Sequence, residues 1–356
     1  MFGAAEDAGR QTDYAVADGQ MAKASRAGFN TIRLTQMWTT GERTLGAADT
    51  TALGNVLRAA KAKGIRIVLS IYPVGSSVTP TAAAARSDFA AFAADIARRF
   101  PGLRDVIVGN EPNINRFWLP QFGPNGEDVA ATSYEQLLAA TYDALKQVDR
   151  DLIVYGGALA PRGSDKPNTG RDTHSPTAFI ADLGAAYRAS GRKEPIMDAL
   201  AIHPYPATST TGAGLAHPRT TAIGLADYAK LVGLLGAAFD GTGQRGSTLP
   251  VLYDEFGVET AVPAAKASSY SGVEPTTTHP ADEATQARIY ADALAAAACQ
   301  RNVLGLLLFH VQDEPLLAGW QSGVFYADGS PKSSLEAVRA AVERAQATKP
   351  GACPSR

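Results

Sequence analysis

The sequence predicts one α/β domain built as a (β/α)8 TIM barrel. Short apolar runs that are typical of strands alternate with helix-like segments along nearly the whole chain, which favours a parallel sheet with crossover helices. The run 65–72 is apolar at almost every position, as in a strand covered on both faces. No linker rich in Pro, Gly or Ser divides the 356 residues. We therefore expect a single domain over 1–356, with 1–20 and 348–356 peripheral.

Seven strands are predicted, each followed by a helix or by a loop and a helix. An eighth strand, which a closed barrel needs, would be short and would have to come first, at 2–5 or before Met1. The alternative is an open doubly wound sheet, which would have a glycine-rich phosphate loop after its first strand, and no such motif follows any strand here. The strands are expected at 31–38, 65–72, 104–108, 152–155, 199–202, 251–253 and 303–309, and the helices at 21–27, 51–63, 87–100, 133–148, 175–189, 222–239, 282–300 and 333–347.

Local signals support several of these helices. In 51–63, Leu53 and Val56 belong to one apolar stripe, and Gly64 follows as a favoured helix end. Ser133 and Gln136 have the spacing of a capping box, so the fourth helix is expected to begin at Ser133.

Composition restricts the class of protein. Hydrophobic residues make up 45% of the chain and charged residues 19%, as expected for a globular protein. The net charge is −2 and no block of like charges occurs, which argues against a nucleic-acid or anionic-membrane surface. No run of 18 or more apolar residues could span a bilayer.

The two cysteines, Cys299 and Cys353, form no CxxC or Cys/His cluster, so a structural zinc site is not expected. A disulfide between them would suit an exported protein, and two free thiols are the alternative. The first residues, 1–5, contain no basic segment and no long apolar stretch, so they are not a signal peptide as they stand. We expect a secreted protein whose leader is not part of this chain, with a cytoplasmic protein as the alternative.

Two carboxylates directly follow apolar runs, Glu111 after the run that ends at Val108 and Glu255 after the run 251–253. Pro112 should hold Glu111 in extended backbone, because its ring restricts the residue before it. The strand ends of a parallel barrel converge on one face, so the two glutamates should meet there. Glycoside hydrolysis requires such a pair, one protonated and one ionised.

Five segments carry a recognisable pattern: Gly28–Arg33 on the second strand, Val108–Asn113 on the fourth, His203–Tyr205 on the sixth, Tyr253–Gly257 on the seventh, and the turn Tyr326–Lys332 before the last helix. In this order and spacing they resemble the clan A glycoside hydrolases, which are retaining enzymes on a TIM barrel, and in particular families 5 and 39. The resemblance covers nearly the whole chain.

The resemblance implies a role for each catalytic residue. Glu111 would be the general acid and then the general base, and Glu255 would attack the anomeric carbon. Arg33 would keep Glu255 ionised and oriented, and Tyr205 would donate a hydrogen bond to it. Asp254 is expected to have a structural role, because alternation along a strand points it away from its neighbour Glu255.

The same resemblance implies contacts to the sugar. Asn110 would bind the 2-hydroxyl group, and His203 would line the subsite of the sugar that is transferred. On the last strand His310 stands near where the clan often has an aromatic platform, which leaves Phe309 and Trp320 as the aromatic candidates there. Further candidates for contact with substrate are Trp38, Trp118, His310 and Trp320.

The expected activity is therefore retaining hydrolysis of O-glycosidic bonds in a plant or microbial oligosaccharide, polysaccharide or glycoside. A transglycosylase with the same glycosyl-enzyme is one alternative, and a non-catalytic carbohydrate-binding barrel is another. A metal-dependent barrel hydrolase would want a His-x-His motif, but the five histidines are scattered singly. No cofactor or metal is expected, and the expected partner is a carbohydrate substrate, with no nucleic acid and no membrane span.

Overall fold

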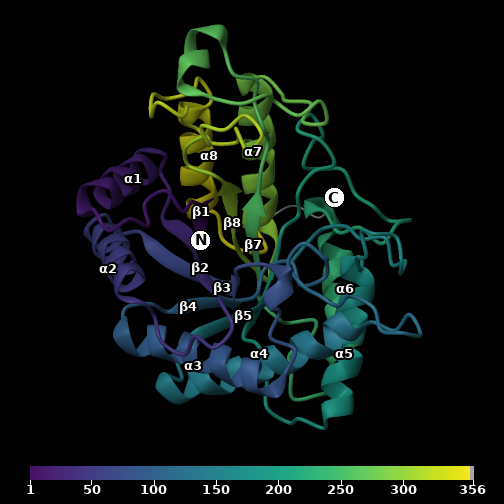
Figure 1. The fold of residues 1–356 in the computed structure, drawn as a ribbon. Helices are drawn as coiled ribbons and strands as arrows, with labels where there is room; N and C mark the ends of the chain where they lie inside the picture. Colours follow the sequence, from purple (N-terminus) through teal and green to yellow (C-terminus); the bar gives the residue numbers. More distant parts are fainter. Residues whose placement is uncertain (353–356) are drawn as a thin grey trace.

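The computed structural model describes residues 1–352 as a closed barrel of eight parallel strands, in the order β1 to β8, surrounded by helices (Figure 1). The predicted fold class is therefore confirmed. The strands are β1 Phe2–Ala5, β2 Thr31–Trp38, β3 Arg66–Pro73, β4 Asp105–Val108, β5 Ile153–Leu159, β6 Ala199–Ile202, β7 Val251–Phe256 and β8 Val303–Phe309. The helices are α1 Tyr14–Arg26, α2 Ala47–Ala62, α3 Ala83–Arg99, α4 Val129–Val148, α5 Pro176–Ser190, α6 Tyr228–Phe239, α7 Glu283–Cys299 and α8 Leu335–Ala347.

Strand β1 closes the barrel. Gly3 pairs with Thr31 of β2, and Ala4 pairs with Leu308 of β8. The expectation that 1–20 is peripheral is therefore wrong, because this segment contains an inner strand and the start of α1. Cys353 lies outside the described residues, and so does its predicted disulfide.

The start of α4 also differs from the prediction. The helix begins one turn earlier, where the Asp128 side chain accepts a hydrogen bond from the Ala131 amide. Ser133 lies inside the helix and accepts a hydrogen bond from the Trp118 indole. Asp128 is as good a cap as Ser133, so sequence alone could not choose between them. The end of α2 follows the prediction, since Gly64 has a positive φ of 67° just beyond it.

The barrel interior is packed and its amino-terminal end is sealed. Apolar side chains from several strands, including Val68, Ile107 and Leu252, fill the centre. Below them Asp105 is fully buried and accepts hydrogen bonds from Arg66 and Tyr155. Polar residues that could meet a ligand therefore collect at the opposite end, where the strands finish.

None of the helices within residues 1–352 combines the length and the apolar character that crossing a membrane would require.

Candidate active site

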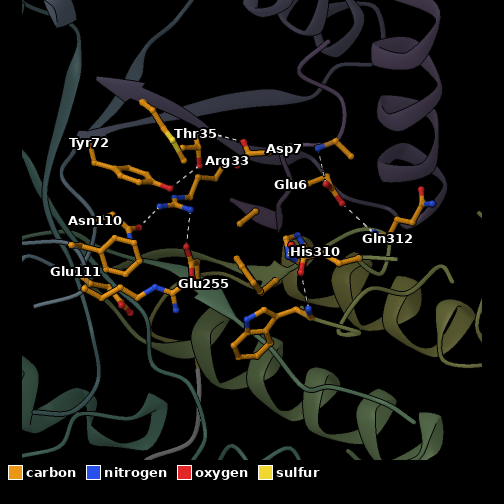
Figure 2. A pocket seen from close by; sticks show the side chains of 18 of the residues that line it. Glu6, Asp7, Arg33, Thr35, Tyr72, Asn110, Glu111, Glu255, His310 and Gln312 are labelled. Carbon is orange, nitrogen blue, oxygen red and sulfur yellow. Dashed lines mark hydrogen bonds and ion pairs between the residues drawn. The ribbon is translucent and has the colours of Figure 1, made fainter. Parts of the chain in front are cut away.

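A cavity of about 860 Å³ opens over the carboxyl-terminal ends of the strands. Both predicted catalytic glutamates line it, Glu111 just beyond β4 and Glu255 on β7, together with Arg33 and Asn110 (Figure 2). Residues that lie up to 222 positions apart in the sequence are thus brought into one polar cluster.

Glu255 is held by two donors. Nη1 of Arg33 lies 2.7 Å from Oε1 of Glu255, and the Tyr205 hydroxyl donates to Oε2 at 2.8 Å. Nη2 of Arg33 also donates to Oδ1 of Asn110 at 2.7 Å. Burial alone would lower the pKa of Arg33, but Glu255 and Asp254 outweigh it and raise the pKa, so this cation is permanent. Burial and the Glu255 charge raise the pKa of Tyr205, which therefore stays protonated and remains a donor.

The backbone at Glu111 departs from the prediction. Its φ is +41°, in the left-handed region, and not extended as Pro112 was expected to impose. A non-glycine residue there carries strain of about 1–3 kcal/mol that surrounding contacts must offset. The Glu111 amide donates to the carbonyl oxygen of Ala158 at 2.8 Å, which ties the turn to the end of β5. The carboxylate is thus presented by a strained turn that tertiary contacts fix.

Gly109 makes the close packing beneath this turn possible. Its φ is +94°, and a Cβ at this position would approach the Tyr134 ring to 3.0 Å. The Tyr134 hydroxyl donates to the Val108 carbonyl and accepts from the Gly157 amide, each at 2.6 Å. This one buried side chain of α4 therefore joins the ends of β4 and β5 under the catalytic turn.

His203 lies between the two glutamates. Its Nδ1 is 3.0 Å from Oε1 of Glu111 and 3.5 Å from Oε2 of Glu255. Since both oxygens contact the same nitrogen, they can be no more than about 6.5 Å apart. Burial alone would lower the pKa of His203, but the Glu255 and Asp254 carboxylates outweigh it and raise the pKa to about 10.

His203 is fully buried and is not among the residues that line the cavity, which corrects the expectation that it lines the sugar subsite. It supports the carboxylates from below. The expectation for Asp254 is corrected as well. Although it is fully buried, its Oδ2 lies 3.3 Å from Nε2 of His203 and 3.2 Å from Nε of Arg33, so it belongs to the catalytic cluster.

The predicted sugar contacts divide into two groups. Trp320 and His310 line the cavity, and the Trp320 ring lies 5.3 Å from that of Tyr205. Trp38 and Trp118 do not line it, which corrects the expectation for both. The Trp38 ring is fully buried against Phe89, and that of Trp118 packs against Tyr134. Apolar packing between strands and helices holds these two rings away from the site.

Several cavity residues were missed from the sequence. Tyr72 lies near the end of β3, and Glu6 and Asp7 follow β1 (Figure 2). Arg116 also lines the cavity, from the long loop after β4. Glu6 and Asp7 directly follow the strand at 2–5, so their position at a strand end predicts that they face the site, as it does for Glu111. Glu6 accepts hydrogen bonds from the Val311 and Gln312 amides, so it fastens the turn after β8.

Within residues 1–352, no group of three or more His, Cys, Asp or Glu side chains is arranged to hold a metal ion.

Comparison with solved structures identifies the same fold in glycosidases. A complex of the GH5_18 enzyme from Streptomyces cattleya with Manβ1-4GlcNAc is 17% identical, with a TM-score of 0.64 over 99% of this chain and 82% of that one. The GH5-4 broad-specificity endoglucanase from Clostridium longisporum is 14% identical, with a TM-score of 0.59 over 98% and 97%. The GH39 enzyme from Xanthomonas axonopodis pv. citri is 17% identical, with a TM-score of 0.59, and the match spans 95% of this chain and 65% of that enzyme. At these identities the likeness shows the fold.

The family is shown by the sequence. No curated protein matches this chain. The pattern of the family described as Cellulase (glycosyl hydrolase family 5), however, matches residues 8–271, which is well over half of the chain and contains both glutamates. The matched region, the barrel and the paired carboxylates agree, and the chain belongs to glycosyl hydrolase family 5 and is a glycoside hydrolase.

Proposed function

We propose that this enzyme hydrolyses O-glycosidic bonds with retention of configuration, in two displacements at the anomeric carbon. Glu255 is the nucleophile and Glu111 is the acid and base. The proposed substrate is a plant or microbial oligosaccharide, polysaccharide or glycoside.

The observation that carries this proposal is the shared contact of both glutamates with Nδ1 of His203. Carboxyl groups are about 5–5.5 Å apart in retaining glycosidases and about 6.5–9.5 Å apart in inverting ones, which need room for a water molecule. An upper limit of about 6.5 Å between the two oxygens supports the retaining arrangement.

The surroundings of the two glutamates support unequal roles. Glu255 contacts a permanent cation, Arg33, and a hydroxyl donor, Tyr205, which hold its two oxygens in place. Glu111 contacts neither of these donors, and the side-chain hydrogen bond it has is with His203. Glu255 is therefore oriented as a nucleophile would need, and Glu111 is left for the role of acid and base.

The reaction then has two steps. An oxygen of Glu255 bonds to the anomeric carbon while the bond to the leaving oxygen breaks and Glu111 gives its proton to that oxygen. Glu111 next removes a proton from water, whose oxygen bonds to the anomeric carbon as the ester to Glu255 breaks. Asn110, held by Arg33 at the cavity wall, is placed to contact the sugar.

The aromatic lining supports a carbohydrate ligand. Trp320 and Phe309 line the cavity next to Tyr205, and Phe117 lines it with Tyr72. Such rings can cover the apolar face of a pyranose. The structures with this fold include enzymes described as an endoglucanase and a β-xylosidase, which agrees with a sugar chain as substrate.

The test is a panel of nitrophenyl glycosides and plant and microbial polysaccharides, scored for release of product. The anomer formed first from the best substrate is identified by proton NMR before mutarotation. We expect the product to retain the configuration of the substrate. An inverted first product contradicts the double displacement, and sugar binding without turnover in the whole panel contradicts the assignment of hydrolysis.

A further inference from the structure

Asp254 has an unusual set of contacts for a fully buried carboxylate. Its Oδ2 contacts Nε2 of His203 at 3.3 Å and Nε of Arg33 at 3.2 Å. Its Oδ1 is buried and has no hydrogen-bond partner within the part of the chain that the structure describes. Both contacts are therefore to side chains that themselves touch the catalytic glutamates.

Asp105, another buried aspartate of this barrel, has a different set of partners. Asp105 accepts hydrogen bonds from Arg66 and Tyr155 at the sealed end of the barrel, far from the cavity. A carboxylate that served only the fold would be expected to have such partners, because an incompletely bonded buried anion is costly. Asp254 instead leaves one oxygen unbonded and directs the other to His203 and Arg33.

His203 is surrounded by hydrogen-bond acceptors. Carboxylate oxygens face both ring nitrogens, those of Glu111 and Glu255 at Nδ1 and that of Asp254 at Nε2. A further ionisable neighbour is Tyr205, whose ring meets the imidazole edge-on at 6.2 Å. Glu255 at Nδ1 and Asp254 at Nε2 are ionised and only accept hydrogen bonds, so a neutral imidazole would direct a lone pair at one of these two. The doubly protonated ring is the form that donates from both nitrogens.

The formal charges of the cluster agree with this form. Arg33 and a protonated His203 give two cations, and Asp254 and Glu255 give two anions. The cluster is then neutral when Glu111 carries its proton, which is the state needed for the first chemical step. Without the Asp254 charge, the second buried cation would have no anion of its own.

We propose that Asp254 is a positioning residue that keeps His203 doubly protonated, so that Nδ1–H of His203 stabilises the Glu111 carboxylate formed when the leaving group takes its proton. This role rests on the proposed function, in which Glu111 is the acid. It assists only reactions whose leaving group needs that proton.

The experiment compares Asp254→Asn with the wild-type enzyme on two glycosides of the same sugar. One carries a poor leaving group, such as phenol, and the other carries 2,4-dinitrophenolate, which departs without a proton. Losing a charge-assisted hydrogen bond should lower kcat/KM for the phenyl glycoside about 10- to 100-fold. The value for the dinitrophenyl glycoside should stay within about threefold, since its transition state needs little proton transfer.

The pH dependence of kcat/KM is a second measurement, which would not change if Asp254 had only a structural role. In Asp254→Asn one of the carboxylates that raise the pKa of His203 is lost, so the alkaline limb of kcat/KM should move. Asp105→Asn is the matched control, because it neutralises an equally buried aspartate at the other end of the barrel. It should change stability but neither the leaving-group ratio nor the alkaline limb.

Equal losses with both leaving groups would overturn the proposal, since they would mean that Asp254 acts through Arg33 and Glu255 or through folding. Unchanged kinetics would overturn it too. Glu111→Ala, measured in parallel, separates this failure from that of the proposed function. If Glu111→Ala shows no selective loss with phenyl glycoside, the acid assignment itself is wrong.

A measurement on the wild-type enzyme covers the case in which Asp254→Asn does not fold. The chain has five histidines, so nitrogen-15 NMR with a His203→Asn variant for assignment can report the state of both ring nitrogens. We expect His203 to be doubly protonated at pH 8. A neutral ring at that pH would overturn the proposal.

Discussion

A guanidinium nitrogen of Arg33 lies 2.7 Å from a carboxylate oxygen of Glu255, joining β2 to β7 at the mouth of the barrel. Both side chains are largely buried, so solvent screens this ion pair little. The nucleophile proposed for this glycosidase is therefore fixed in direction before substrate binds.

Replacing Glu255 by alanine should lower kcat about 10⁴-fold or more, because the covalent step loses its nucleophile. Sodium azide should restore part of the activity by occupying the vacated space and attacking the anomeric carbon. The product would be a glycosyl azide of inverted configuration, identified by NMR. The control is Glu343→Ala on the surface of α8, and wild-type activity in Glu255→Ala would refute the nucleophile assignment.

Arg33→Lys keeps a positive charge but loses the planar fork that reaches both Glu255 and Asn110. We expect kcat to fall while the fold is largely maintained. Arg33→Met leaves the buried Glu255 and Asp254 charges without their cation, which should cost about 3–5 kcal/mol of unfolding free energy. Urea denaturation followed by circular dichroism measures this loss, and equal stability of both variants would contradict the prediction.

Tyr205→Phe removes the hydroxyl that donates to Glu255 at 2.8 Å. A hydrogen bond to a charged group contributes about 1.5–3 kcal/mol, so kcat should fall about 10- to 100-fold. Steady-state kinetics on an activated aryl glycoside test this change. Tyr142→Phe, in which a hydroxyl away from the cavity is lost from α4, is the matched control and should leave kcat unchanged.

Trp320 and Trp38 should respond in opposite ways to alanine. Trp320 lines the cavity, so its replacement should raise KM about 2- to 10-fold through lost stacking. Trp38 is buried against Phe89, so its replacement should cost about 3–5 kcal/mol of stability. Thermal unfolding together with KM separates the two effects. A raised KM at full stability for Trp38→Ala would show that its assignment to the core is wrong.

Stability should depend on pH through Glu259. Burial, together with the Glu274 and Glu314 charges, raises its pKa to about 7. The folded chain therefore binds this proton more tightly than the unfolded chain, whose glutamate has a pKa of about 4.3. The stabilisation from this group is complete below the unfolded value and is lost as pH rises through 7.

The Glu259→Gln variant tests this linkage because it cannot ionise. After allowance for solvent screening, it should be about 1 kcal/mol more stable than the wild type at pH 8. The difference should be much smaller at pH 4.5. Denaturation curves at the two pH values measure it, with Glu336→Gln on the exposed face of α8 as the control. A larger gain at pH 4.5 than at pH 8 would contradict the sign.

Much of the site followed from where polar residues stand along the chain. Glu111 and Glu255 follow apolar runs, and the strand ends of a parallel barrel must converge. Burial of Trp38 and Trp118 could not be read in this way, since an aromatic residue near a strand end suits either a sugar platform or the core. The ring belongs to the core if its face of the strand or loop meets the packed helices, and to the sugar site if it does not.

The sequence by itself determined the barrel and the two carboxylates, because the alternation of apolar runs and the position of a residue in a strand are local properties. Only the tertiary structure decided that β1 is complete, that Glu111 is held at a positive φ, and that Asp254 and His203 lie beneath both glutamates. These features depend on the pairing of β1 with β2 and β8, on the hydrogen bond from the turn after β4 to β5, and on the contact of His203, just beyond β6, with β7. Contacts between distant strands set the burial and charge of each group, and no single segment of the chain contains that information.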